Sequence, residues 1–202
     1  MPDKMIYLIR HAHPDYPGGV KMCLGRKNDL PLSPVGFEQA ESLRRFFSAI
    51  PLEAVYASPL LRARQTAEAV ANGLRPVHIL DDLIELDGGE WDGLTFDELR
   101  ERYPIHFAKS GRRFLNPPGG ESNESGLARI RAALDHVDTG TLRCAAIVAH
   151  GGVNRLLLCD LLGLPMDEKR KTAQDYAGVS LLALENGIWT VQELCIPIPD
   201  MR

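Results

Sequence analysis

The 202-residue sequence has little of what builds disulfide frameworks, zinc sites or membrane spans. Its four cysteines, Cys23, Cys144, Cys159 and Cys195, lie far apart and include no Cys-x-x-Cys pair. This argues against a zinc ribbon and a dense disulfide framework and favours reduced thiols. No segment approaches the roughly 18 apolar residues of a membrane span, and the start MPDKMIYLIRH lacks the long apolar stretch of an export signal. We expect a soluble, cytoplasmic protein.

A charge excess of either sign is also missing. The formal net charge is −4 and the charged residues are interspersed, so nucleic acid and anionic lipid are not expected as partners. The chain has no glycine-rich phosphate loop, internal repeat or low-complexity tract, and nothing in it indicates an oligomeric state. Any site for an anion must therefore be local, and a small molecule is the expected partner.

Short apolar runs alternate with helical patterns along the chain. Met5 to Ile9, Ala54 to Ser58 and Cys144 to Ala149 are nearly continuous apolar runs, as in parallel strands covered on both faces. Ser33-Pro34 and Ser58-Pro59 each predict a helix start, and the second of these helices should stop at Gly73. Thr95 to Glu98 predicts a capping box, Ser122 a fourth cap, and a fifth helix follows His150-Gly151-Gly152.

The last part of the chain predicts two strands joined across Asn186-Gly187, a strong hairpin signal. Together these patterns predict a single domain over residues 1–202, a three-layer α/β/α sandwich with a mostly parallel sheet and an antiparallel edge. The segment from Arg102 to Gly120 is the main irregular excursion and could wall a pocket. Its basic pair, Arg112-Arg113, could equally well bind charged groups of a substrate or face solvent.

Charged and titratable residues follow the ends of the apolar runs. Arg10 and His11 end the first run, His150 ends a later one, Arg62 falls in a helical first turn, and Glu85 precedes Gly88-Gly89. In open α/β sheets the carboxyl ends of the strands face the ligand crevice, so these side chains should converge. Two histidines, two arginines and one carboxylate suit phosphoryl transfer, because guanidinium groups match phosphate oxygens and imidazole can attack phosphorus.

Six stretches, in their order along the chain, resemble the histidine phosphatase superfamily, whose fold is phosphoglycerate mutase-like. They are YLIRHAHP, DLPLSPVGFEQA, ASPLLRARQTA, LIELDGGEWDGLT, PPGGES and VAHGG. The resemblance implies that His11 is the nucleophile that forms a phosphohistidine. It implies that Arg10, Arg62 and His150 grip the phosphoryl oxygens, and that Glu85 is the general acid and then the base. No metal or other cofactor is implied. Independently of the family, His11 must be neutral to attack, with its other ring nitrogen held by an acceptor.

The sequence departs from the family pattern after the nucleophile. Ala12 stands where the family has glycine, and Pro14 and Pro17-Gly18 occupy the places of its threonine and asparagine. Either a neighbour such as Arg26 replaces the missing phosphate donor, or turnover is slower. The stretch GGVKMCLGRKNDLPLS is similar to a loop of α-ribazole phosphatases, which act in cobalamin biosynthesis, although Leu24 replaces a tyrosine and Asn28 resembles an insertion. It makes Gly25 and Arg26 candidate substrate contacts.

Other interpretations stay open at this point. His11 and His13 form an H-x-H pair that could hold a metal, but His78, His106 and His136 read as surface or helix-end residues. Arg62 could be a surface cation like Arg64. Glu85 competes with other acids of its segment, and Trp91 reads as core or pocket wall. The alternatives to the α-ribazole phosphatase are a sugar-phosphate or bisphosphate phosphatase, a mutase-like enzyme, and a catalytically weak phosphate-binding module.

Overall fold

The computed structural model describes residues 2–104, 116–138 and 141–201. Within these ranges six strands form one sheet in the order β3-β2-β4-β1-β5-β6. The first four of this order are parallel, whereas β5 pairs antiparallel with β1 and with β6. The strands are β1 (Lys4–Arg10), β2 (Ala54–Ala57), β3 (Val77–Ile79), β4 (Cys144–Ala149), β5 (Val179–Glu185) and β6 (Ile188–Ile196).

The helices fall between the strands in the alternating order that the sequence predicts. The α-helices are α1 (Pro34–Ser48), α2 (Leu61–Ala71), α3 (Phe96–Arg102), α5 (Asn123–Asp138) and α6 (Gly151–Leu161). The short 3-10 helices are η1 (Pro17–Gly19), η2 (Asp81–Leu83), η3 (Gly89–Trp91) and η4 (Met166–Thr172).

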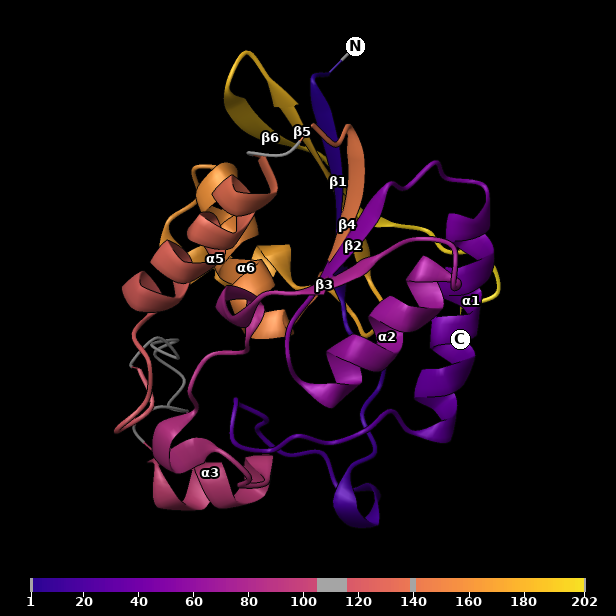
Figure 1. Ribbon diagram of the computed structural model, residues 1–202. Helices are drawn as coiled ribbons and strands as arrows, with labels where there is room; N and C mark the ends of the chain where they lie inside the picture. The colour runs from indigo at the N-terminus through magenta and orange to yellow at the C-terminus, as the bar shows by residue number, and fades with distance from the viewer. Residues whose placement is uncertain (1, 105–115, 139–140, 202) are drawn as a thin grey trace.

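Two apolar cores cover the two faces of the sheet, so the fold is a three-layer α/β/α sandwich (Figure 1). On one face α1 and α2 bury Leu43, Phe47 and Val70 against the sheet. On the other, α5 and α6 bury Leu134 and Leu157. Central strands that are apolar on both sides explain why the sequence shows continuous apolar runs instead of alternation.

The register of the parallel strands brings three chain segments to one edge of the sheet. Arg10 of β1 pairs with Ala149 of β4, and Ala57 of β2 pairs with Val148. The residues that follow these strands, His11, His150 and Ser58, therefore start at the same carboxyl edge. This edge lies on the side of the molecule where α3 is found in Figure 1.

Most predicted element ends are confirmed. Ser33 caps α1 by accepting a hydrogen bond from the Gly36 N–H, and Thr95 forms a capping box with Glu98 at α3. The Ser125 N–H donates to Ser122 Oγ at the start of α5. The predicted hairpin turn is present, with positive φ values of 53° and 76° at Asn186 and Gly187.

One predicted helix start is wrong. The helix α2 begins at Leu61 and not at Ser58-Pro59, because the Ser58 hydroxyl is used elsewhere: it accepts from the Leu60 N–H and contacts the ring of His150. Asn72 ends α2 in the left-handed conformation, one residue before the predicted Gly73. The strand β3 was not predicted. It has only three residues, too few for a periodic pattern.

Of the irregular segment from Arg102 to Gly120, residues 105–115 lie outside the described ranges, and with them Arg112, Arg113 and His106. Among the described residues, no helix combines the length and the apolar character needed to cross a bilayer.

Candidate active site

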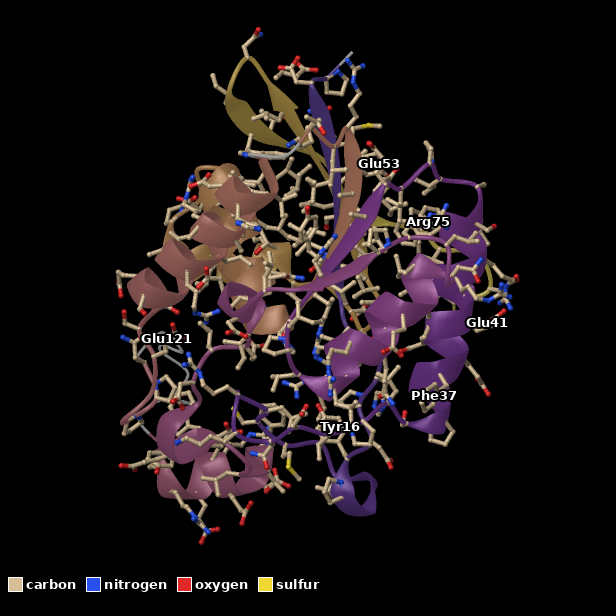
Figure 2. All side chains as sticks on the ribbon, in the orientation of Figure 1. Tyr16, Phe37, Glu41, Glu53, Arg75 and Glu121 are labelled. Carbon is tan, nitrogen blue, oxygen red and sulfur yellow. The ribbon has the colours of Figure 1, made fainter. Side chains whose placement is uncertain are left out.

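A pocket of about 400 Å³ opens at the carboxyl edge of the sheet. Its walls include polar side chains from segments far apart in the sequence, namely Arg10, His11, Lys21, Glu85, Asp87, Glu121 and Arg155. Its apolar and aromatic walls come from Tyr16, Met22, Leu24, Leu86, Trp91, Phe96 and Tyr176. Tyr16 and Glu121, labelled in Figure 2, lie on loops beyond the carboxyl ends of the strands. Trp91 is thus a wall of the pocket, one of the two roles expected for it.

His11 is held as a neutral imidazole with a defined tautomer. Its Nδ1 lies 2.7 Å from the carbonyl oxygen of Ala12, and because a carbonyl only accepts, Nδ1 carries the proton. Burial, and then the charges of Arg62 and Arg10, lowers the pKa of His11 well below 6.5. The lone pair of Nε2 is therefore available for attack on an electrophile.

Ala12 is part of this arrangement. Its side chain is fully buried, and its N–H donates to Oγ1 of Thr66 at 3.0 Å. Thr66 in turn donates to the carbonyl oxygen of Arg62, so the backbone beside His11 is tied to α2. The methyl group at position 12 packs in the core formed with α1 and α2.

His150 lies directly beside His11. The ring centroids are 5.0 Å apart, and His150 Nε2 lies 2.7 Å from Ser58 Oγ. His150 is fully buried, and burial followed by the charge of Arg62 lowers its pKa well below 6.5. The two histidines that the sequence placed on separate strands thus form one neutral pair.

The two arginines differ in position: Arg10 lines the pocket, whereas Arg62 is not among the lining residues. Arg10 donates from Nη1 to the carbonyl oxygen of Gln174 at 2.8 Å. Arg62 is fully buried and donates to the carbonyl oxygens of Asn28 and Gly25 at 2.9 and 3.2 Å. Burial lowers the pKa of Arg62 while the charge of Glu85 opposes the shift, and an arginine in this range stays cationic.

Of the buried side-chain atoms that have no hydrogen-bond partner in the described part of the chain, three belong to residues whose ring or charge acts on His11. They are Nε of Arg10, Nε of Arg62 and Nδ1 of His150. Buried polar atoms in native proteins nearly always have partners, so unpaired atoms need an explanation. Unpaired nitrogen atoms on two cationic side chains and one imidazole are suited to binding an oxyanion.

Glu85 lies at the N-terminus of α6, where backbone N–H groups surround its carboxylate. Oε2 accepts from Gly152 at 2.9 Å, and Oε1 accepts from Val153 at 3.2 Å and from Leu86 at 2.8 Å. The side chain is mostly buried and lines the pocket. A Cβ added at Gly152 would approach Oε1 of Glu85 to 2.3 Å, so only glycine allows this close contact.

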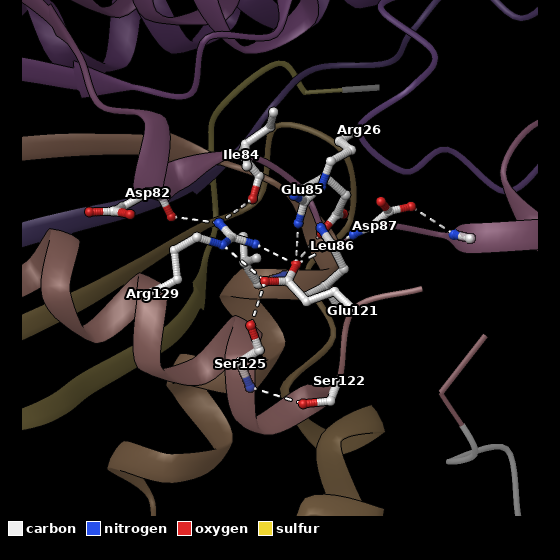
Figure 3. Close-up of polar contacts among 12 residues, drawn as sticks. Arg26, Asp82, Ile84, Glu85, Leu86, Asp87, Glu121, Ser122, Ser125 and Arg129 are labelled. Atoms are coloured by element: carbon white, nitrogen blue, oxygen red, sulfur yellow. Dashed lines mark hydrogen bonds and ion pairs between the residues drawn. The ribbon is translucent and has the colours of Figure 1, made fainter. Parts of the chain in front are cut away.

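An ion pair at the pocket wall, between Arg129 and Glu121, fixes the segment that carries Glu85 (Figure 3). Arg129 of α5 contacts Glu121 with Nε and Nη2, and it donates from Nη1 to the carbonyl oxygens of Asp82 and Ile84. Glu121 also accepts from the Asp87 N–H at 3.4 Å. Hydrogen bonds therefore hold the backbone on both sides of Glu85.

The two weaker candidates, Gly25 and Arg26, have different positions. Gly25 lines the pocket, and its N–H donates to Asp92 at 2.9 Å. Arg26, like Arg62 and His150, is absent from the pocket lining, but it differs from them in pairing with an acid, Glu121, at 2.5 Å. Its guanidinium is thus engaged in the network around Glu121, and its position does not support the expectation that it replaces a missing phosphate donor.

Sequence reasoning missed two residues that shape the loop near Arg62. Asn28, which reads as an insertion in the sequence, offers its carbonyl oxygen to Arg62 and its amide to Asp92. Asp92 also accepts from the Lys27 N–H, so this one carboxylate organises the loop from Gly25 to Asn28. An Asn or Asp in a loop gives no signal of such a role before its partners are known.

Two further titratable residues near the site are held neutral. Burial, with the charges of Asp92 and Glu85, raises the pKa of Cys23 to about 12, so its thiol stays protonated at neutral pH. Burial and then the charge of Lys21 lower the pKa of His13, whose Nδ1 lies 2.9 Å from Ser33 Oγ. His13 is not among the pocket-lining residues. In the described ranges, no three His, Cys, Asp or Glu side chains are arranged to hold a metal ion.

Known proteins resemble this chain over most of its length. A family model described as histidine phosphatase superfamily (branch 1) matches residues 6–197. Phosphoserine phosphatase 1 of Hydrogenobacter thermophilus is 31% identical over 89% of this chain and 86% of its own length. The adenosylcobalamin/α-ribazole phosphatase of Salmonella typhimurium is 27% identical over 94% of this chain and 90% of its own. The structure of Bacillus stearothermophilus YhfR superimposes with a TM-score of 0.84 at 28% identity, covering 94% and 96% of the two chains.

Proposed function

The chain belongs to the histidine phosphatase superfamily, and from this premise we propose that it hydrolyses a small-metabolite phosphomonoester through a phosphohistidine at His11. Its membership of this family shows that it is a phosphatase. The proposal concerns which residues act and on what. The observation that supports it is the set of unpaired nitrogen atoms from Arg10, Arg62 and His150 around a neutral His11.

In the first step, Nε2 of His11 attacks the phosphorus and the P–O ester bond breaks. The Ala12 carbonyl holds Nδ1–H and stabilises the positive charge that develops on the ring. Glu85 gives a proton to the leaving oxygen, so that the alcohol departs neutral. A positioned carboxylic acid contributes about 10²–10⁴-fold to such a step.

In the second step, water attacks the phosphohistidine and Glu85 takes the proton from it. Inorganic phosphate and free His11 result, and the enzyme is restored. The guanidinium groups of Arg10 and Arg62 and Nδ1 of His150 offset the charge of the phosphoryl oxygens in both steps. Because these groups supply the positive charge, the reaction requires no metal ion.

For the substrate, α-ribazole 5′-phosphate is the leading candidate, which would place the enzyme in cobalamin biosynthesis. The Gly25 loop and the apolar wall residues Leu24, Leu86 and Trp91 support a phosphoester with a large apolar part. The Salmonella relative carries this substrate in its name. The free thiols of the four cysteines fit the cytoplasm as the compartment.

Phosphoserine is the second candidate, since a relative named for it is 31% identical over most of the chain. Sugar phosphates, sugar bisphosphates and a mutase reaction on the same scaffold remain the broader alternatives. The pocket volume of about 400 Å³ lies in the range of small-molecule sites and does not by itself rank these candidates.

Two measurements test the proposal. The kcat/KM for α-ribazole 5′-phosphate, phosphoserine, sugar phosphates and bisphosphates, each with and without chelator, should rank α-ribazole 5′-phosphate first and show no effect of the chelator. Rapid quenching with radiolabelled substrate should give a phosphoenzyme that is labile in acid and absent from His11→Ala. A protein that binds phosphate but never becomes labelled would be a binding module, and loss of activity with chelator would indicate a metallohydrolase.

A further inference from the structure

The hydroxyl groups of Tyr16 and Tyr176 lie 2.5 Å apart, although the residues are 160 positions apart in the sequence. Tyr16 is on the loop after β1, and Tyr176 is on the loop before β5. Both side chains line the pocket together with Arg10 and His11. Neither tyrosine belongs to the motifs that identify the family.

Tyr176 lies against the catalytic groups themselves. Its ring covers the guanidinium of Arg10, with Cζ 3.9 Å from the ring centroid, and its centroid is 5.6 Å from that of His11. Lys21 Nζ lies 5.4 Å from the same ring at the mouth of the pocket. A phosphoryl group that faces His11 and is held by Arg10 must therefore lie beside this tyrosine.

The backbone around Tyr176 is strained and firmly held. Ala177 is a fully buried non-glycine residue with φ of 57°, a left-handed conformation that costs a side-chain-bearing residue free energy. Its N–H donates to the carbonyl oxygen of His11 at 3.1 Å, and the Arg10 N–H donates to Gly178 at 2.9 Å. Strain that is tied directly to the nucleophile's own backbone indicates a function for the position of Tyr176.

The two phenols carry two O–H groups between them. One O–H is donated within the pair, so one O–H remains, and the described part of the chain supplies no acceptor for it. Burial, and then the hydrogen bond to Tyr176, raises the pKa of Tyr16, so that this phenol remains protonated. The rings of His11 and His13, which contact Tyr176, carry no negative charge that would attract the remaining O–H in place of a phosphoryl oxygen.

We infer that Tyr16 and Tyr176 act as one hydrogen-bond donor to the phosphoryl oxygens, with one phenol orienting and polarising the other, which binds the substrate. The inference rests on the proposed function, because it assumes that the anion lies between Arg10 and His11. Hydrogen bonds to charged groups are about twice as strong as neutral ones, so the loss of the outer phenol is costly.

Phenylalanine variants test the inference because they remove only oxygen and keep both rings. We expect Tyr16→Phe and Tyr176→Phe each to weaken the binding of inorganic phosphate, measured by calorimetry, the larger effect being about ten-fold or more. Since the hydroxyls work as one unit, the double variant should lose no more than the worse single variant. Tyr56→Phe, which removes a buried phenol from β2 outside the pocket, is the matched control and should leave phosphate affinity unchanged.

Turnover of p-nitrophenyl phosphate and the melting temperature complete the test. A purely structural pair would lower the melting temperature of the Phe variants with phosphate affinity unchanged, and this result would overturn the inference. Independent, additive losses in the double variant would also overturn it. If the wild-type protein binds phosphate in a Tyr176-dependent way but turns over no ester, the donor pair stands and the proposed enzymatic function fails.

Discussion

Arg129 donates a hydrogen bond to the backbone carbonyl of Ile84 at 2.7 Å, one residue before Glu85. The same guanidinium nitrogen reaches the carbonyl of Asp82, and the other nitrogens hold Glu121 (Figure 3). Burial alone would raise the pKa of Glu121, but the hydrogen bond and charge of Arg129 outweigh it and keep the pKa below 4.5. The ion pair between Arg129 of α5 and Glu121, which precedes this helix, thus positions the segment that carries the proposed acid, Glu85.

Arg129→Lys should therefore impair the acid step more than the fold. An ammonium cannot keep both the two-point contact with Glu121 and the two carbonyls, so Glu85 becomes less well fixed. We expect kcat for alkyl phosphates to fall about 10- to 100-fold, the size expected for a small misplacement. Arg131→Lys, on the same helix, alters an exposed pair with Asp160 and is the control. Equal kcat values in the two variants would contradict the positioning role.

Arg62→Lys should reduce kcat/KM severely, because a positive charge alone does not suffice at this position. Arg62 uses two nitrogens to hold the loop carbonyls of Gly25 and Asn28 and keeps further N–H groups for a phosphoryl oxygen. A lysine retains the charge but cannot do both, so kcat/KM should fall by about 10²-fold or more. The exposed neighbour Arg64, changed to lysine, provides the control and should keep wild-type kcat/KM. A mild effect of Arg62→Lys would place the phosphoryl group elsewhere.

Glu85→Gln should separate substrates by their leaving groups. The variant cannot donate a carboxylic proton, and its amide would face backbone N–H groups where a carboxylate oxygen now accepts. We expect the rate for an alkyl phosphate to fall about 10²–10⁴-fold and the rate for p-nitrophenyl phosphate far less, since nitrophenolate leaves without a proton. Asp81→Asn, an exposed acid of the same segment, should change neither. Equal slowing of both substrates would remove Glu85 from the acid role.

The sequence predicted the framework of this site because the framework depends on local signals. Apolar runs marked the central strands, and caps marked α1, α3 and α5. The topology rule for parallel sheets then placed His11 and His150 at one edge, as the 5.0 Å ring distance shows. The helix start at Ser58 was wrong because a good capping residue had a tertiary partner, His150, that outweighed its local preference.

What the sequence could not supply were contacts between irregular segments. The hydroxyls of Tyr16 and Tyr176 meet across 160 residues, and neither loop has a periodic pattern that would bring them together. Arg26 is similar: its charge suggested an anion site, but Glu121, 95 residues away, pairs with it. Loop conformations depend on such pairings, which no local propensity encodes.

The buried histidines should make the folded protein sensitive to mild acid. Both His11 and His150 have pKa values well below 6.5, chiefly through burial, whereas in the unfolded chain they titrate near 6.5. As the pH falls below 6.5, the unfolded chain binds protons that the folded protein excludes, so the free energy of unfolding decreases. The slope is roughly 1.4 kcal/mol per pH unit for each histidine, down to the lowered pKa.

Urea unfolding between pH 5 and pH 8 measures this slope. His150→Asn removes one titrating group and should flatten the dependence between pH 5 and 6.5 by about 1.4 kcal/mol per pH unit. The exposed His78 on β3, changed to asparagine, serves as the control and should leave the slope as in the wild type. Added inorganic phosphate should reduce the acid sensitivity, because a bound anion favours protonated imidazoles beside it. A slope identical in the wild type and His150→Asn would mean that His150 binds a proton as readily in the folded protein as in the unfolded chain, which would contradict the neutral histidine pair.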